Sequence, residues 1–404
     1  MQIKERYQLK FEADAFNIFN HPDFDAPNNN VTFFPNFVGP LSIPPRQLGP
    51  DPAHDWQPAL PAVGIAPGIL ISGRSGRTLL SQLSTKERQR GLASLALIAL
   101  VLVQNQSAFA WGNEGHTWIN HAAAEKIPPS MPKFLRRAVV EIAYLGPEPD
   151  RWRSSAEFQL KNAQEPDHFI DLELVSWLDP LPQGRYEFYR KLYEHRAAGI
   201  DHPDDYLPEH VGLQPYATLE VYGRLKAALR EYRQRLAAHQ PTQAVQQAVI
   251  FYAGWLGHYV ADGSQPLHTT IQYNGWVGPN PNGYTAEHKI HGQFETAYVA
   301  ANITEKDFAG MVNAPEHLMD PFTDYTAYLR NSKTLVENVY QIEKAGGFTG
   351  KGTPEAFDFT TKRLAAGSQM LLNLWYTAWL ESAVPAPEHA SSPATPTPTA
   401  LPSK

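Results

Sequence analysis

Imidazole and carboxylate side chains recur at helical spacing in the second half of the chain. His258 and Asp262 are four residues apart in GHYVADGSQPLH, and His291 and Glu295 repeat that spacing in HGQFE. Residues four apart share one face of a helix, so each pair offers a rigid part of a metal site. Imidazole nitrogen and carboxylate oxygen together are typical zinc ligands. The spacing therefore predicts two partial metal sites.

Other candidate ligands stand before and between these pairs. The chain has 15 histidines and no cysteine, so a metal must bind imidazole, carboxylate or backbone groups. A single histidine on a helix face is more often packed or exposed than a ligand, but an ordered set is more specific. The further candidates are Trp111 and His116 in WGNEGH, Asp150 in PEPDRWR, His168 in DHFIDLE, and His268 after the helix-breaking Gly263 and Pro266.

The segment before Trp111 has the three parts of a secretory signal peptide. Basic residues precede an apolar run at 92–103, LASLALIALVLV, and the small-residue pattern Ala108-Phe109-Ala110 follows it. The run is shorter than the roughly 20 residues that a membrane-spanning helix needs. We therefore expect residues 86–110 to be a signal peptide and the protein to be secreted or periplasmic; a membrane anchor is the alternative. Cleavage would give Trp111 a free α-amine.

Residues 1–85 differ from the rest of the chain. They are rich in Pro, Asn and Gly, and residues 1–60 resemble the C-terminal strands of a TonB-dependent outer-membrane receptor. Such a strand fragment cannot pair its edges alone. A signal peptide also belongs at a chain start, and no methionine lies between Met1 and Met131. We interpret 1–85 as a non-native extension; a genuine extension is the alternative. Too little of the chain has strand periodicity for a receptor barrel.

The residues that would position these ligands have helical periodicity. Proline and N-capping residues mark the predicted helix starts, and glycines mark several of the ends. Few runs of alternating β-branched residues, the pattern typical of strands, occur. The expected fold class is all-α, with one helical domain at 111–382. The tail at 383–404, rich in Pro, Thr, Ser and Ala, is expected to be disordered. The predicted helices are 132–145, 216–239, 242–262, 320–346 and 353–382.

Composition narrows the class of protein. The chain has 404 residues, of which 43% are hydrophobic, which is enough for a globular core. Its net charge is −7 and it has no long basic tract. A duplex DNA binder that depends on a basic face is therefore disfavoured. A nuclease that holds phosphate through metal ions is still compatible with this charge.

The ordered set of candidate ligands resembles the zinc-dependent phospholipase C and single-strand nuclease superfamily, which includes the S-one and P-one type nucleases. The resemblance extends from Trp111 to about Ser382, and WGNEGH and GHYVADGSQPLH are its most specific parts. It implies an all-α fold with three zinc ions in a cleft. The implied ligands are Asp150, His168, His258 and Asp262 for the first ion; His268, His291 and Glu295 for the second; and the α-amine and carbonyl of Trp111 with His116 and Asp262 for the third.

The same resemblance implies roles in catalysis. Asp262 would bridge the first and third ions, which would supply the hydroxide that attacks phosphorus. Asp150 would also orient or deprotonate the nucleophile, and Arg153 would bind the phosphate. Phe169 would stack on a base and Asp171 would hydrogen-bond it. A surface arginine and a core phenylalanine are the alternative interpretations of Arg153 and Phe169.

The spacing of the candidate ligands favours the nuclease branch. The short Trp111 to His116 interval, the long His268 to His291 interval and Arg153 fit nucleases, whereas Glu295 is the ligand type of the phospholipases. The expected function is a secreted phosphodiesterase that hydrolyses single-stranded DNA or RNA to 5′-nucleotides. Hydrolysis of phospholipid head groups and a non-catalytic metal-binding domain are the alternatives. No stable protein partner is implied, and a monomer is expected.

Overall fold

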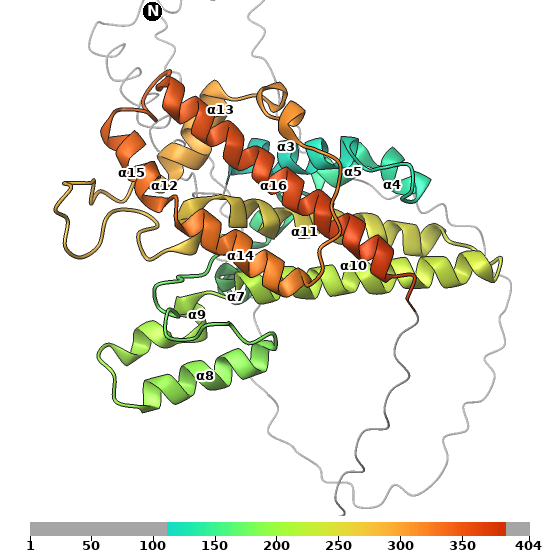
Figure 1. The fold of residues 1–404 in the computed structure, drawn as a ribbon, viewed down its shortest axis with the longest axis horizontal. Helices are drawn as coiled ribbons and strands as arrows, with labels where there is room; N and C mark the ends of the chain where they lie inside the picture. Colours follow the sequence, from blue (N-terminus) through green and yellow to red (C-terminus); the bar gives the residue numbers. More distant parts are fainter. Residues whose placement is uncertain (1–110, 385–404) are drawn as a thin grey trace, which may run out of the picture. The chain divides into compact units, whose positions relative to one another are not determined.

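The computed structural model describes residues 111–384, which form a helical body (Figure 1). These residues contain no strand, and their sole β-type pairing is an isolated bridge between Tyr273 and Gly275. The predicted all-α fold class is therefore confirmed. No helix among the described residues has the length and apolarity needed to span a membrane. The predicted extension (1–85), the signal peptide (86–110) and residues 385–404 of the tail lie outside the described residues and stay predictions.

The helices are connected by both short turns and longer loops, the latter before α8 and before α12. In chain order the α-helices are α3 (Gly112–Glu125), α4 (Lys133–Arg137), α5 (Val139–Tyr144), α6 (Glu148–Trp152), α7 (Phe158–Gln164), α8 (Arg185–Ala197), α9 (Pro208–Val211), α10 (Gln214–Ala237), α11 (Gln243–Ser264), α12 (Ile290–Gly292), α13 (Val299–Asn302), α14 (Pro321–Lys333), α15 (Val336–Lys344) and α16 (Pro354–Glu381). The shorter turns used below are η2 (Glu165–His168), η4 (Pro266–Thr269) and η5 (Gln293–Tyr298).

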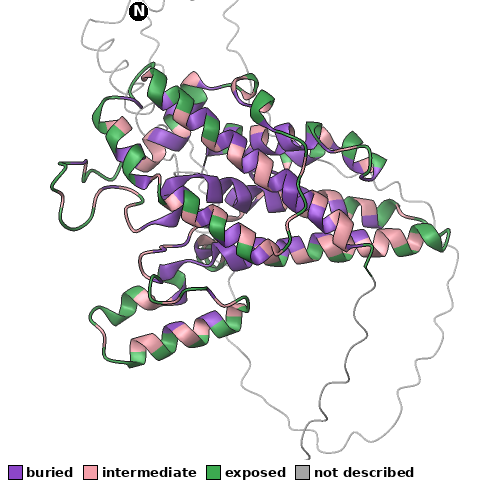
Figure 2. Ribbon diagram, viewed as in Figure 1, coloured by how far each residue is buried: buried purple, intermediate pink, exposed green. Residues whose placement is uncertain are grey.

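Helix α11 is the centre of this body. It packs against α10, α16, α3 and α5, and its C-terminal half is buried on every side (Figure 2). Buried residues run without interruption from Leu256 to Ser264, which include the candidate ligands His258 and Asp262. A helix that is enclosed on all sides is normally apolar on every face. The buried polar side chains of His258 and Asp262 therefore need specific partners.

Glycines let α3 and α5 approach α11 closely. A Cβ atom on Gly257 would lie 1.8 Å from Oδ1 of Asn120 on α3, and one on Gly254 would lie 2.3 Å from Cβ of Leu145. The Asn120 amide then donates to the carbonyls of Ile142 and Gly254, each at 2.9 Å. These contacts fix the helix that carries His116 against the helix that carries His258.

A Gly257→Ala variant is expected to be destabilised by at least about 1–3 kcal/mol, because an added atom in a packed core forces its neighbours to shift. Gly223→Ala is the matched control, since nothing lies within 4 Å of a Cβ at that position of α10. Helix propensity alone predicts that this control gains up to about 1 kcal/mol. Urea unfolding of the two variants and the unaltered protein measures both changes. Equal stability of the two variants would contradict the close approach.

The helix boundaries depart from prediction at two breaks. The predicted helix 132–145 divides into α4 and α5, because Ala138 leaves helical geometry at φ −95° and ψ 26°. The predicted helix 320–346 divides into α14 and α15 between Lys333 and Val336. Helix α8 was not predicted, since its apolar residues follow no clear helical stripe and its buried residues are just Phe188 and Leu192.

Candidate metal centre

The predicted side-chain ligands come together from elements spread over much of the described chain. Nearly all of them are buried, and His291 is the most exposed, with 12% of its side chain accessible. Their elements are α3 for His116, α6 for Asp150, η2 for His168, α11 for His258 and Asp262, η4 for His268, α12 for His291 and η5 for Glu295. Three groups have the proximity needed to hold a metal ion: His116, His258 and Asp262; Asp150, His168 and His258; and His268, His291 and Glu295.

The first two groups share His258 and form one cluster. Nδ1 of His168 lies 3.0 Å from Nε2 of His258 and 3.0 Å from Oδ2 of Asp262. Oδ1 of Asp150 lies 3.8 Å from Nε2 of His258. Two ligands of a tetrahedral zinc ion with bonds of about 2.0 Å are about 3.3 Å apart. The separations in this cluster are close to that spacing.

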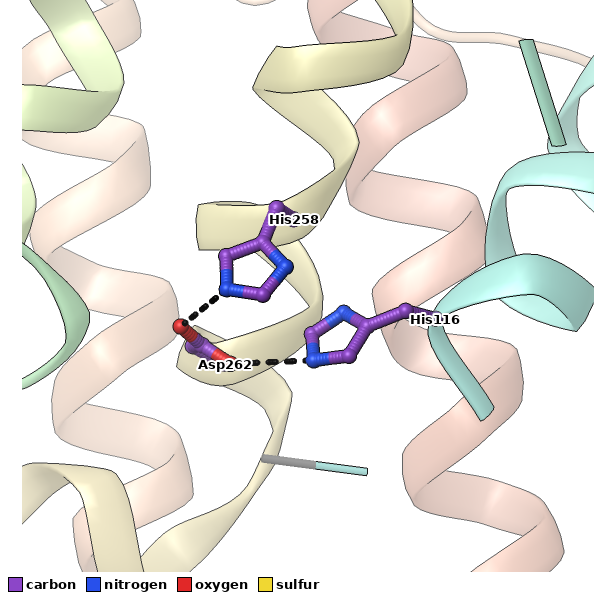
Figure 3. A group of neighbouring side chains, drawn as sticks. All are labelled: His116, His258 and Asp262. Carbon is purple, nitrogen blue, oxygen red and sulfur yellow. Dashed lines mark ion pairs between the residues drawn. The ribbon is translucent and has the colours of Figure 1, made fainter. Parts of the chain in front are cut away.

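The two carboxylate oxygens of Asp262 face different histidines. Oδ2 lies 3.4 Å from Nε2 of His258, whereas Oδ1 lies 3.4 Å from Nε2 of His116 (Figure 3). The His116 and His258 rings are stacked, with their centroids 4.0 Å apart. The two oxygens of Asp262 are therefore close to different potential ligands, and its role as a bridge between two ions stays a prediction.

The third group lies at the junction of η4, α12 and η5. Nε2 of His291 lies 2.9 Å from Oε1 of Glu295, and Nε2 of His268 lies 3.4 Å from Oε2. Glu295 belongs to a π-helical turn, a rare geometry that is frequent at functional sites. The pair therefore shares a helical face, although the helix is wider than the one the spacing predicted.

Three rings are oriented by backbone carbonyls. Nδ1 of His258 lies 2.9 Å from the Gly146 carbonyl, Nδ1 of His268 lies 2.7 Å from the His168 carbonyl, and Nδ1 of His291 lies 2.9 Å from the Tyr273 carbonyl. Donation from Nδ1–H leaves the Nε2 lone pair for a metal ion, which is the usual arrangement behind metal-binding histidines.

Two buried carboxylate oxygens of the clusters have no hydrogen-bond partner among the described residues. They are Oδ2 of Asp150 and Oδ1 of Asp262, which lie 4.0 and 3.4 Å from Nε2 of His116. A buried polar atom left in this way costs about 1–3 kcal/mol. The donor set, its spacing and these atoms fit a divalent cation of the zinc type. The structure thus contains histidine and carboxylate clusters that can bind metal.

Burial sets the protonation states in these clusters. It raises the pKa of Asp150 to about 7, although the Arg153 guanidinium opposes the shift. It raises the pKa of Asp262 well above its usual range, and it lowers the pKa of His168 and His258 well below theirs. The two histidines are therefore neutral at physiological pH, as ligands must be. The carboxyl groups of Asp150 and Asp262 retain protons that a cation must displace.

Metal affinity is expected to fall as the pH is lowered from 8 to 6. A cation must displace the proton that Asp150 holds below its pKa of about 7, and burial also raises the pKa of Asp262, whose proton must be displaced as well. Each displaced proton weakens binding by up to about tenfold per pH unit below that value. His168 and His258 add nothing in this range, since burial lowers their pKa. Calorimetric titration with zinc across this range measures the slope. An affinity independent of pH would contradict the assignment of Asp150 as a ligand.

Trp111 anchors the start of α3 to the metal-bearing helix. Its side chain is fully buried, and its indole Nε1–H donates to the Ala261 carbonyl at 2.8 Å and lies 3.0 Å from Oγ of Ser264. Its carbonyl accepts the first helical hydrogen bond from Gly115, at 3.0 Å. These contacts hold Trp111 beside the turn that carries Asp262. The roles of its α-amine and carbonyl as ligands stay predictions.

A pocket of about 650 Å³ opens beside the clusters. His168, His268 and His291 form part of its lining, and the predicted substrate residues Arg153, Phe169 and Asp171 line it too. Phe169 is half-buried, so it is not a core residue alone. Nη1 of Arg153 lies 3.3 Å from Oδ1 of Asp150, and Nη2 lies 3.5 Å from Oε1 of Glu165. The structure thus brings the predicted phosphate and base contacts to one pocket.

The pocket also has lining residues that the sequence analysis missed. Glu209 and His210 on α9 belong to the lining, and α9 is held there because the Asp171 amide donates to the Val211 carbonyl at 2.7 Å. Gly212 makes this approach possible, since a Cβ there would lie 2.2 Å from the Phe169 carbonyl oxygen. No motif marked α9, because its ends are defined by contacts with a distant segment.

The loop between His268 and His291 carries the aromatic residues Tyr273, Trp276 and Tyr284, which have two kinds of surroundings. Tyr273 is exposed and lines the pocket. Trp276 and Tyr284 instead pack against Tyr340 of α15, with ring centroids 5.1 and 5.6 Å from it. Of these loop aromatics, Tyr273 is therefore the one available to a substrate, and the other two support the loop.

Comparisons with known proteins add little to this geometry. No protein-family model matches the sequence, and no curated protein matches it. Among solved structures, the chain is similar to alpha-toxin of Clostridium perfringens, with a TM-score of 0.27 and 12% identity. The match covers 66% of this chain and 63% of the toxin chain, which is less than two thirds of the toxin. A likeness of this strength assigns no function, which must come from the clusters and the pocket.

Proposed function

We propose that residues 111–382 are a zinc-dependent phosphodiesterase of the phospholipase C and single-strand nuclease superfamily, with single-stranded DNA or RNA as its substrate. The observation that carries this proposal is the buried cluster of His116, Asp150, His168, His258 and Asp262 beside a pocket that contains Arg153. The proposal includes three zinc ions, a monomer, and export followed by cleavage before Trp111.

The residues of this chain would bind and orient the phosphodiester. Zinc ions held by the clusters would polarise phosphoryl oxygens and provide hydroxide at neutral pH. Arg153 presents a guanidinium with 19% of its side chain exposed, and two carboxylates hold it in position. A guanidinium fixed in this way can bind two phosphate oxygens at once.

Two lining residues of the pocket, Phe169 and Asp171, suit a nucleobase. Phe169 offers an aromatic face, and stacking on an aromatic ring contributes about 1–3 kcal/mol per base. Burial, with the nearby Glu173 carboxylate, raises the pKa of Asp171 to about 8. A protonated Asp171 can both donate and accept, which matches the adjacent donors and acceptors on the edge of a base.

Phospholipid is the second candidate substrate. Glu295 is the ligand type that resembles the phospholipases, and Tyr273 exposes 54% of its surface at the pocket. An exposed aromatic side chain beside a polar site suits a lipid–water interface. This candidate also needs the metal clusters, so it shares the phosphodiesterase chemistry of the first.

A paired assay tests the proposal on protein that begins at Trp111. It compares release of nucleotides from single-stranded DNA and RNA with release of phosphocholine from phosphatidylcholine, each with and without a chelator. We expect chelator-sensitive release of nucleotides. Cleavage of the lipid alone would assign the phospholipid candidate. No chelator-sensitive activity on either substrate class would refute the phosphodiesterase proposal and leave a metal-binding domain.

A further inference from the structure

A second pocket lies between α14, α15 and α16 and has a volume of about 710 Å³. None of its lining residues belongs to the metal clusters. Amide side chains of Asn331, Asn338 and Gln341 line it together with apolar groups, among them Leu335 and Phe359. The pocket therefore combines hydrogen-bond donors with an apolar surface, which is typical of sites for small organic ligands.

Arg363 supplies an uncompensated positive charge to this pocket. Among the described residues its guanidinium makes no hydrogen bond and no ion pair. Burial lowers the pKa of Arg363, which is the direction expected for a cation removed from water without a counter-ion. The guanidinium thus has unused donors within the pocket.

The acidic residues of the same pocket do not neutralise Arg363. Asp358 is paired with Lys362, whose Nζ lies 2.7 Å from Oδ2 of Asp358. Glu355 is exposed in the first turn of α16, and no ion pair joins it to Arg363 among the described residues. A partly buried charge without a partner destabilises a fold, whereas an anion that binds it removes this cost.

We propose that the pocket between α14, α15 and α16 binds a small phosphate monoester, with the phosphate on Arg363 and the organic group against Phe359 and Leu335. A guanidinium presents several N–H donors in one plane, and phosphate offers several acceptor oxygens to them. The amides of Asn331, Asn338 and Gln341 supply further donors. This site is separate from the proposed phosphodiesterase site, and it stands whether or not that proposal holds.

The test compares phenyl phosphate with inorganic phosphate on zinc-loaded full-length chain, Arg363→Gln and Lys362→Gln. Lys362→Gln is the matched control, because it removes a neighbouring charge that already has a partner. We expect Arg363→Gln to weaken the binding of phenyl phosphate to this pocket by at least about tenfold, since hydrogen bonds to a charged group are among the strongest in proteins. Inorganic phosphate should bind this site more weakly, because it lacks the organic group.

Calorimetry and thermal unfolding distinguish the three proteins. Calorimetry on all three proteins separates this site from the zinc site, since zinc-bound phosphate contributes equally to each. Thermal unfolding should show that phenyl phosphate stabilises the unaltered chain and Lys362→Gln more than Arg363→Gln. Binding and stabilisation that are identical in the three proteins would overturn the proposal. If Arg363→Gln does not fold, Arg363→Lys replaces it. Weaker binding is then expected because the lysine ammonium lacks the planar set of N–H donors of a guanidinium.

Discussion

An Asp262→Asn variant is expected to lose at least one zinc ion per chain and more than about 100-fold in phosphodiesterase activity. The amide is nearly the same size as the carboxylate but carries no charge, and each carboxylate oxygen of Asp262 faces a different histidine. Loss of a residue that merely supports a metal ligand costs about 10–100-fold, so a shared ligand should cost more. Metal analysis by mass spectrometry and the nucleotide-release assay measure the two effects.

Asp167→Asn is the matched control for this variant. Asp167 is also buried, but its carboxylate pairs with Arg185, 3.7 Å away, and belongs to none of the three metal-capable groups. Its substitution should lower stability and leave the zinc content unchanged. Near-normal turnover and full zinc content in Asp262→Asn would show that the cluster is not the catalytic centre.

Protein that retains residues before Trp111 is expected to hold one zinc ion fewer than protein that begins at Trp111. The nitrogen lone pair of an amide is delocalised into its carbonyl, so it is a poor ligand, whereas a free α-amine is a good one. Trp111 is held beside the turn of Asp262 through its indole in the described structure. Measurement of the zinc content of the two forms compares them directly.

Trp111→Phe separates the backbone effect from the side-chain effect. This change keeps the α-amine but removes the indole donor to Ala261 and Ser264. We expect protein that begins at Phe in this position to hold its zinc less tightly, yet still to bind more than the uncleaved chain. Equal zinc content in the cleaved and uncleaved forms of the unaltered sequence would rule out the α-amine as a ligand.

The sequence predicted the metal clusters better than the pocket, for a physical reason. The spacing of His258 and Asp262 determines a shared face once α11 is a helix, and helix periodicity is a local property. Glu295 shows the limit of this reasoning, because the π-helical turn that carries it depends on packing. The contribution of α9 depends on a backbone hydrogen bond between Asp171 and Val211, far apart in sequence. No local pattern encodes such a contact.

The break at Ala138 illustrates the same limit. Pro132 and Gly146 correctly indicated where a helical segment begins and ends, but nothing in the local sequence required two helices between them. The close approach of Leu145 to Gly254 and the hydrogen bond from Asn120 to Ile142 place α5 against its neighbours. Tertiary contacts thus override helix propensity at this position.

The carbonyls that orient the rings of His258, His268 and His291 also bear on how ions enter and leave. In zinc fingers the polypeptide is unfolded until the ion arrives, so loading and folding are one event. In this chain, main-chain carbonyls contact the rings, and a large apolar core surrounds the helices that carry them. We therefore expect chelator-stripped protein to keep its helical circular dichroism spectrum and to accept cobalt in place of zinc without refolding, which would make the centre visible to optical spectroscopy.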